Sequence, residues 1–201
     1  METRRRPPGR PPAASKEDVE QAAVALMIDR GYENVSVEDI AAAAGIGRTT
    51  FFRYFGSKSG VIWLEFDSTI ERLADVLEAS ADADDVLGSV RTAVLESTRL
   101  AVFSSDVWLE RFQLLDTTPD LHAGAQARWE QWRLPIESFV ANRAGDHVDH
   151  YVPMVVAAAC HAVFVAELRH WRNRDSERID LLTRLDAHLG NVLSHLDGLF
   201  G

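Results

Sequence analysis

The stretch SVEDIAAAAGIGRTTFFRYFGSK, residues 36–58, decides the fold of the N-terminal part of this 201-residue chain. Ser36 and Asp39 have the spacing of a helix capping box, and apolar residues then recur at helical spacing until Gly45. Glycine ends a helix readily because it adopts the left-handed backbone conformation. A short second helix follows from about Gly47 to Gly56. Two helices joined by a glycine turn predict a helix-turn-helix.

The second of these helices separates aromatic from cationic side chains. Phe51 and Phe55 are four residues apart and are predicted to anchor it on the first helix of the pair. Arginine pairs with guanine and a threonine methyl contacts thymine, so Arg48 and Thr49 are predicted to read DNA bases. The remaining outward residues are predicted to meet the phosphate backbone or to lie beside it: Phe52, Arg53, Tyr54 and Lys58.

The distribution of charge favours the same part of the chain for contact with DNA. The formal net charge is -10, but residues 1–60 carry a net charge of +1 and the remainder -11. An acidic domain repels phosphate, so contacts with nucleic acid are expected from the first 60 residues. Residues 1–14 hold three consecutive arginines and four prolines and are predicted to be a disordered arm. This arm is either a solubilising tail or, through its GRPP, a minor-groove segment similar to an AT-hook.

Working outward, the whole chain shows helical periodicity, and no alternation typical of strands has useful length. A helix from Ser15 to Gly31 is expected before the quoted stretch, and a long helix capped by Ser57 after it. Beyond residue 84 we expect five more helices, with Pro119 in the first turn of the seventh. The sequence therefore predicts an all-α fold, divided into the arm 1–14, a helix-turn-helix domain 15–60 and a larger helical domain 61–201.

The span from Asp18 to about Phe66 resembles the DNA-binding domain of TetR-family regulators, through its capped helix, AxAAG turn and FFRYFGSK ending. The resemblance implies a TetR-like fold of about nine helices and a homodimer on a DNA operator. A tyrosine is usual at the place of Phe52, so its phosphate contact is in doubt here. The implied DNA-binding residues are Ser36, Arg48, Thr49, Phe52, Tyr54 and Lys58, and the implied dimer interface, on the last two helices, comprises Ala158, Ala162, Leu185, Leu189, Val192 and Leu196.

A narrower resemblance, to the TetR regulators associated with mycofactocin biosynthesis, rests on FFRYF, on Trp63 with Phe66 and Asp67, and on WR followed by FVANR. It implies an apolar small-molecule effector, such as a fatty acyl thioester. The residues expected at a ligand site are Trp108, Phe112, Trp129, Trp132 and Arg133, although aromatic residues at helical spacing also fit simple packing. Arg99, Arg111 and Arg128 are expected to be solvated or paired with acidic side chains.

Several function classes are disfavoured. The single cysteine, Cys160, excludes an internal disulfide and fits the cytoplasm, and its apolar run of 13 residues is interpreted as a buried helix rather than a membrane span. The paired histidines have no accompanying ligand cluster, so neither a metal nor a cofactor is expected. No catalytic motif is present. We therefore expect a ligand-responsive transcriptional repressor; the alternatives are a helical enzyme with a vestigial DNA-binding domain and an architectural DNA binder that needs no ligand.

Overall fold

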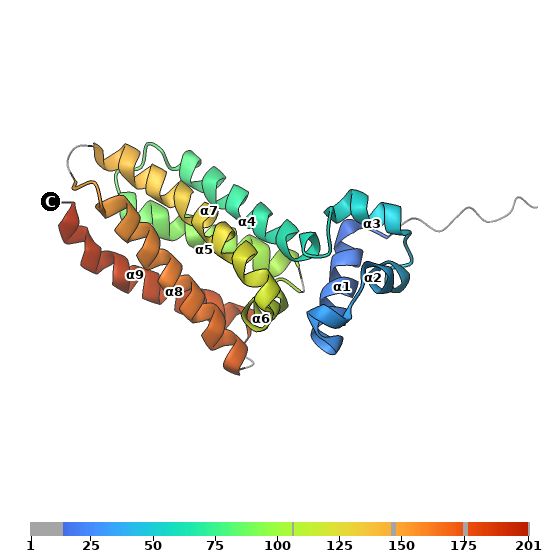
Figure 1. The fold of residues 1–201 in the computed structure, drawn as a ribbon. Helices are drawn as coiled ribbons and strands as arrows, with labels where there is room; N and C mark the ends of the chain where they lie inside the picture. Colours follow the sequence, from blue (N-terminus) through green and yellow to red (C-terminus); the bar gives the residue numbers. More distant parts are fainter. Residues whose placement is uncertain (1–13, 106, 146–147, 175–176, 201) are drawn as a thin grey trace, which may run out of the picture.

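The computed structural model describes residues 14–105, 107–145, 148–174 and 177–200 of the chain. These residues form α-helices and short 3-10 turns and contain no strand, which confirms the predicted all-α fold. Figure 1 shows a small N-terminal group of helices at one end of a longer helical bundle. The predicted arm, residues 1–14, lies outside the described part except for Ala14.

The N-terminal group consists of three helices packed around a small core. They are α1 (Lys16–Arg30), α2 (Val37–Ala43) and α3 (Arg48–Phe55). Capping boxes begin the first two, because Ser15 pairs with Asp18 and Ser36 with Asp39 in the predicted manner. A 3-10 turn, η1 (Tyr32–Asn34), joins α1 to α2.

The larger group begins with α4 (Gly60–Ala79), which leaves the N-terminal helices and runs into the bundle (Figure 1). Ser57 was predicted to cap it, but the helix begins three residues later, and the Ser57 hydroxyl accepts a hydrogen bond from the Gly60 N–H at 3.0 Å. The other helices of the bundle are α5 (Val86–Ser104), α6 (Glu110–Thr117), α7 (Pro119–Ala144), α8 (Val152–Arg174) and α9 (Arg178–Leu196). Pro119 lies in the first turn of α7, as predicted.

The helices of the bundle differ in length and position. The long helices α4, α5, α7, α8 and α9 lie along one another, whereas the short α6 lies at the end of the bundle nearest α1 (Figure 1). The C-terminus of α9 lies at the opposite end, far from the N-terminal helices. This arrangement makes α6 a natural point of contact between the two groups.

Helix α8 contains a long apolar segment. Its segment Val152–Trp171 has 20 residues and a mean hydropathy of 1.6, so by length and composition alone it could cross a membrane. The apolar segment is thus longer than the 13-residue run noted in the sequence. Core helices of soluble proteins pass the same test, and α8 packs against α7 and α9. Cys160 is fully buried on this helix, as predicted, and burial raises the pKa of its thiol to about 12.

Candidate DNA-binding surface and ligand pocket

The short helix α3 is held by two phenylalanines. Phe51 is fully buried and Phe55 nearly so, with their ring centroids 5.3 Å apart. Ile40 of α2 is buried in the same core. Burial of the two rings stabilises α3 by several kcal/mol, on the order of 1.5–3 per side chain. The orientation of α3 relative to α2 is therefore fixed by packing.

The turn between α2 and α3 has the geometry that the sequence predicted. Gly45 has φ 66°, in the left-handed region where glycine is unstrained. The Gly45 N–H donates to the Ala42 carbonyl at 3.2 Å, and the Ile46 N–H to the Ala41 carbonyl at 2.9 Å. These bonds satisfy the end of α2 and redirect the chain into α3.

The opposite face of α3 is exposed and cationic. Arg48, Thr49 and Arg53 are exposed, and Phe52 is 38% exposed. Arg48 forms an ion pair with Glu38 of α2, and its guanidinium lies 5.3 Å from the centroid of the Phe52 ring. An ion pair between exposed side chains contributes at most about 1 kcal/mol. Arg48 can therefore exchange Glu38 for another partner at low cost.

Besides Arg48, three of the predicted DNA-binding residues have hydrogen-bond partners within the chain. The Tyr54 hydroxyl donates to the Ala14 carbonyl at 3.4 Å. The Lys58 ammonium donates to the Tyr32 carbonyl at 3.0 Å and lies 4.0 Å from the centroid of the Tyr32 ring. The Ser36 hydroxyl is used in its capping box. These three residues thus support the fold of the domain, whether or not they also meet DNA.

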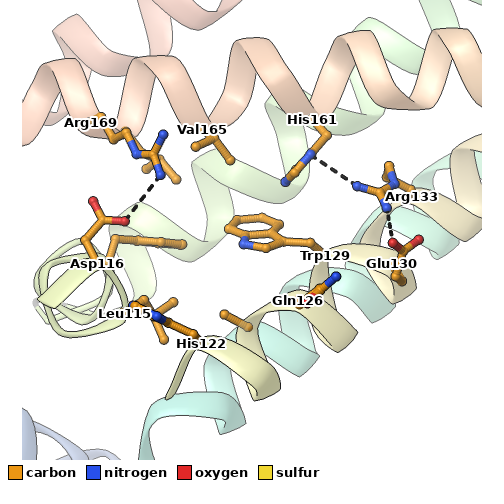
Figure 2. A pocket seen from close by; sticks show the side chains of 13 residues that line it. Leu115, Asp116, His122, Gln126, Trp129, Glu130, Arg133, His161, Val165 and Arg169 are labelled. Carbon is orange, nitrogen blue, oxygen red and sulfur yellow. Dashed lines mark hydrogen bonds and ion pairs between the residues drawn. The ribbon is translucent and has the colours of Figure 1, made fainter. Parts of the chain in front are cut away.

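A pocket of about 620 Å³ lies between α6, α7 and α8 in the bundle. This volume falls within the range typical of small-molecule sites. Figure 2 shows Trp129 near its centre, with polar groups toward either side. Its lining comprises Phe112, Leu115, Asp116, His122, Ala125, Gln126, Trp129, Glu130, Arg133, His161, Val165, Leu168 and Arg169.

The pocket contains only part of the predicted ligand site. Phe112, Trp129 and Arg133 line it, as expected for a ligand site, whereas Trp108 and Trp132 do not. Each of these two tryptophans is 1% exposed, and both pack against Phe164, with ring centroids 6.4 and 5.3 Å away. For Trp108 and Trp132 the prediction of a ligand-lining role is therefore corrected to core packing. Helical spacing indicated that both side chains are buried, but it could not indicate whether a ligand or the protein core covers them.

One side of the pocket is a polar cluster of Arg133, Glu130 and His161 (Figure 2). Arg133 forms an ion pair with Glu130 and lies 3.3 Å from Nδ1 of His161. A guanidinium can only donate, so this nitrogen accepts and the imidazole is neutral. Burial, and then the charge of Arg133, lowers the pKa of His161. The His161 ring also lies 4.8 Å from that of Trp129.

On another side of the pocket, Arg169 of α8 and Asp116 of α6 form an ion pair with an N–O distance of 3.6 Å (Figure 2). Sequence reasoning missed His161, Arg169 and Asp116 as pocket residues. The signal available was a histidine inside an otherwise apolar run, which marks a polar group facing something other than the core. The pocket thus combines an aromatic centre with cationic groups on two sides, each balanced by a carboxylate.

The residues of the predicted dimer interface differ in their exposure. Leu185 and Leu189 have 0% exposure in the single chain, so they belong to its own core and cannot contact a partner; for these two residues the prediction is wrong. Ala158 and Ala162 of α8 are exposed, and Val192 and Leu196 of α9 are half-buried. Met154, which was not among the predicted interface residues, shares the face of Ala158 by helical spacing and is 57% exposed.

The other predicted arginines are paired. Arg99 contacts Glu96, Arg128 contacts Asp67, and Arg111 is fully buried against Glu20. Within the described residues no group of three or more His, Cys, Asp or Glu side chains could hold a metal ion. His147, one of the paired histidines considered for metal binding, lies outside the described residues.

The two groups of helices match two family models. Residues 21–62 match the model for bacterial regulatory proteins of the tetR family, and residues 84–197 match the model for the MftR C-terminal domain. The chain therefore belongs to the TetR family of transcriptional regulators, whose members are not enzymes. Within this family its C-terminal domain is of the MftR type.

The chain is also similar to individual members of the family. It is 29% identical over 191 residues to MftR of Mycobacterium tuberculosis, named as a mycofactocin biosynthesis transcriptional regulator, covering 95% of this chain and 96% of the relative. Its fold resembles that of FadR, a fatty acid degradation regulator from Bacillus halodurans, with a TM-score of 0.67 at 16% identity over 89% of this chain and 98% of FadR. It also resembles SmeT of Stenotrophomonas maltophilia in complex with triclosan, with a TM-score of 0.63 at 19% identity over 88% and 90% of the two chains.

Proposed function

We propose that this regulator is a homodimeric repressor that leaves its DNA operator when an apolar small molecule occupies the pocket. In this proposal, residues 15–60 bind DNA, and residues 61–201 bind the effector and the second subunit. Repression would take place in the cytoplasm, where the DNA is. The observation that carries the proposal is the exposed cationic face of α3, anchored by buried phenylalanines, in a chain that is otherwise strongly acidic.

The DNA contact follows from the exposure of α3. In a helix-turn-helix the second helix enters the major groove, where side chains near its N-terminus reach base edges. Arg48 and Thr49 occupy the first two positions of α3 and are exposed, so both are assigned to base reading. Arg53, Phe52, Tyr54, Lys58 and Ser36 are assigned to the phosphate backbone or to support of the surface.

The effector is inferred from the pocket. Trp129 and Phe112 give it an aromatic centre, and Arg133 and Arg169 could pair with an anionic group on the ligand. A fatty acyl thioester of coenzyme A has this combination, because the acyl chain is apolar and the phosphates of the head group are anionic. Two neighbours in fold give support: FadR is named for fatty acid degradation, and SmeT has been solved with the apolar molecule triclosan.

The second subunit is placed on the exposed face of α8 and on α9. Small side chains at Ala158 and Ala162 allow close helix approach, and Met154, Val192 and Leu196 offer apolar area that a partner would cover. Regulators of this kind read twofold-symmetric sites because both subunits present the same helix to DNA. Dimerisation through α8 and α9 leaves the N-terminal helices free at the other end of the bundle (Figure 1).

The decisive experiment is a fluorescence anisotropy titration of the purified chain against its own upstream DNA and against random DNA of equal length. The proposal expects a preference for the upstream DNA of at least about 10³-fold, typical of specific binders. Addition of palmitoyl-CoA as probe is expected to weaken binding to the upstream DNA only. Palmitic acid alone and CoA alone serve as controls for the two halves of the probe.

Other outcomes of this titration identify the alternatives. Equal affinity for both DNA molecules would favour an architectural DNA binder. Specific binding that palmitoyl-CoA leaves unchanged would retain the regulator but exclude this acyl thioester as its effector. Binding to the upstream DNA that strengthens with the probe would contradict release as the direction of regulation.

A further inference from the structure

A buried ion pair joins the N-terminal helices to the bundle. Arg111 of α6 is fully buried, and the Glu20 side chain of α1 is 5% exposed. One guanidinium nitrogen of Arg111 donates to the Glu20 carboxylate at 2.5 Å, and another donates to the Ile62 carbonyl, in the first turn of α4, at 3.1 Å. Its Nε donates to the Trp108 carbonyl at 3.1 Å. A single side chain thus contacts α1, α4 and the segment that leads into α6.

The pair resists separation. Burial raises the pKa of Glu20 and lowers that of Arg111, while the attraction between them opposes both shifts. A buried charge that loses its partner is strongly unfavourable because neither water nor protein then solvates it. Movement of α6 away from α1 is therefore costly, and movement of α1 together with α6 is not.

The same short helix forms one wall of the pocket. Phe112, Leu115 and Asp116 of α6 line it, and Arg111 directly precedes Phe112. On its other side α6 meets α1, and Leu114 lies with Ile28 in a smaller groove between the two groups of helices. An eight-residue helix moves as a unit, so a molecule that displaces Phe112 and Leu115 also displaces Arg111.

We propose that the Glu20–Arg111 pair, braced on the Ile62 carbonyl, is the connection through which a change in the pocket moves the DNA-binding helices. This inference rests on the proposed role of the pocket as the effector site. Arg111 is a positioning residue, because it touches neither the pocket nor the predicted DNA surface. Besides this pair, the covalent path through residues 56–60 and the packing of α1 and α3 on the bundle connect the two groups of helices.

The test uses the full chain and needs neither DNA nor a ligand. Ala125 lines the pocket on α7, so Ala125→Trp fills part of the cavity in place of an effector. Hydrogen exchange measured by mass spectrometry then reports the local stability of Lys16–Arg30. In the otherwise unchanged chain, Ala125→Trp is expected to change exchange in this helix by about tenfold. In the double variant Glu20→Leu/Arg111→Met, Ala125→Trp is expected to change hydrogen exchange in this helix by less than about twofold. The comparison is made within each background, because loss of the ion pair itself alters the exchange rates before Ala125→Trp is introduced.

The control removes another ion pair between distant parts of the chain. Arg91 of α5 donates through Nε to Asp186 of α9 at 2.7 Å, and neither residue lines the pocket. In Arg91→Met/Asp186→Leu the response to Ala125→Trp should stay at about tenfold. A response lost here too would show that any disturbed ion pair has this effect, and would overturn the inference.

Two further outcomes contradict the proposal: an equal response to Ala125→Trp with and without the Glu20–Arg111 pair, and no response in either. If the double variant does not fold, Arg111→Lys replaces it, because lysine keeps the charge but cannot hold several acceptors in one plane. An unchanged response in Arg111→Lys then contradicts the inference. None of these results bears on whether the chain binds an operator, which the anisotropy titration decides separately.

Discussion

At the residue scale, the most informative side chains are those whose environment differs from what their position in the sequence suggests. Arg48 was predicted to be exposed on α3 and is, but its ion pair with Glu38 was not foreseen. Arg111 was expected to be solvated or paired and is fully buried against a residue 91 positions away. A pairing over such a distance leaves no periodic trace in the sequence, whereas Phe51 and Phe55, four residues apart, do.

Substitution of Arg48 tests base reading. Arg48→Ala is expected to cost about 1–3 kcal/mol on the operator and to relax the preference at one base pair. Lys58→Ala should weaken binding to all DNA sequences alike and reduce the dependence of the affinity on salt concentration. Anisotropy titrations on operator and random DNA at several salt concentrations separate the two. Equal losses on both DNA molecules for Arg48→Ala would contradict its assignment.

Lys58 carries a second expectation. Because its ammonium contacts the Tyr32 carbonyl and ring, Lys58→Ala should also destabilise the N-terminal helices, on the order of 1 kcal/mol. Thermal unfolding followed by circular dichroism measures this loss. The DNA titration of this variant is therefore interpreted at a temperature at which the chain is fully folded.

His161 predicts a dependence of stability on pH. Its pKa is lowered in the folded chain from the usual 6.5, so the unfolded chain binds the proton more readily. The contribution of His161 to stability is thus complete above pH 6.5 and is lost progressively as the pH falls below it. His161→Gln keeps an acceptor for Arg133 but cannot titrate. Its melting temperature should therefore fall less than that of the unchanged chain between about pH 7.5 and pH 5; equal falls would contradict this reading.

At the element scale, the sequence predicted the helices well because their starts and ends are local. The capping boxes at Ser15 and Ser36 and the glycine turn at Gly45 depend on residues three or four positions apart. The start of α4 was placed too early because Ser57 and Ser59 both precede it and either could cap it. The composition of the pocket was predicted less well, since α6, α7 and α8 meet in a way that periodicity does not fix.

The glycine turn gives a matched pair of substitutions. Gly45 has φ 66° and Gly47 does not lie in the left-handed region, yet a Cβ at either would meet no atom within 4 Å. Gly45→Ala should therefore lower the free energy of unfolding by about 1–2 kcal/mol, through backbone strain alone. Gly47→Ala introduces no such strain and should lower it by less, about 0.5 kcal/mol, because Gly47 is the N-cap of α3 and alanine is a poorer cap. Urea denaturation measures both, and similar effects would show that strain is not the cause.

At the scale of the whole molecule, the two groups of helices have different partners. The acidic bundle holds the pocket and an exposed face on α8, and the N-terminal helices hold the cationic surface. Periodicity in α9 correctly marked Leu185 and Leu189 as buried, but it could not tell burial within one chain from burial between two. Only the packing of α9 on α5 and α8 makes that distinction.

The proposed dimer interface is tested by two substitutions with matched exposure. Met154 of α8 is 57% exposed and Leu134 of α7 is 55% exposed. Met154→Arg should weaken dimerisation at least about tenfold, because it places a charge in an apolar contact. Leu134→Arg should leave dimerisation unchanged. Light scattering during size-exclusion chromatography reports the mass of each variant, and a dimer that survives Met154→Arg would place the interface elsewhere.

The ion pair between Glu38 and Arg48 has a small consequence for the affinity of the protein for DNA of any sequence. To engage a duplex, Arg48 must leave an anion of its own chain, and Glu38 is then turned toward the like charge of the sugar–phosphate strand. This penalty is the same on every sequence, whereas the reward of a guanine edge is not. Replacing Glu38 by glutamine should therefore tighten binding to operator and random DNA by a similar factor, so that the residence time on non-operator sites lengthens while the preference for the operator stays the same.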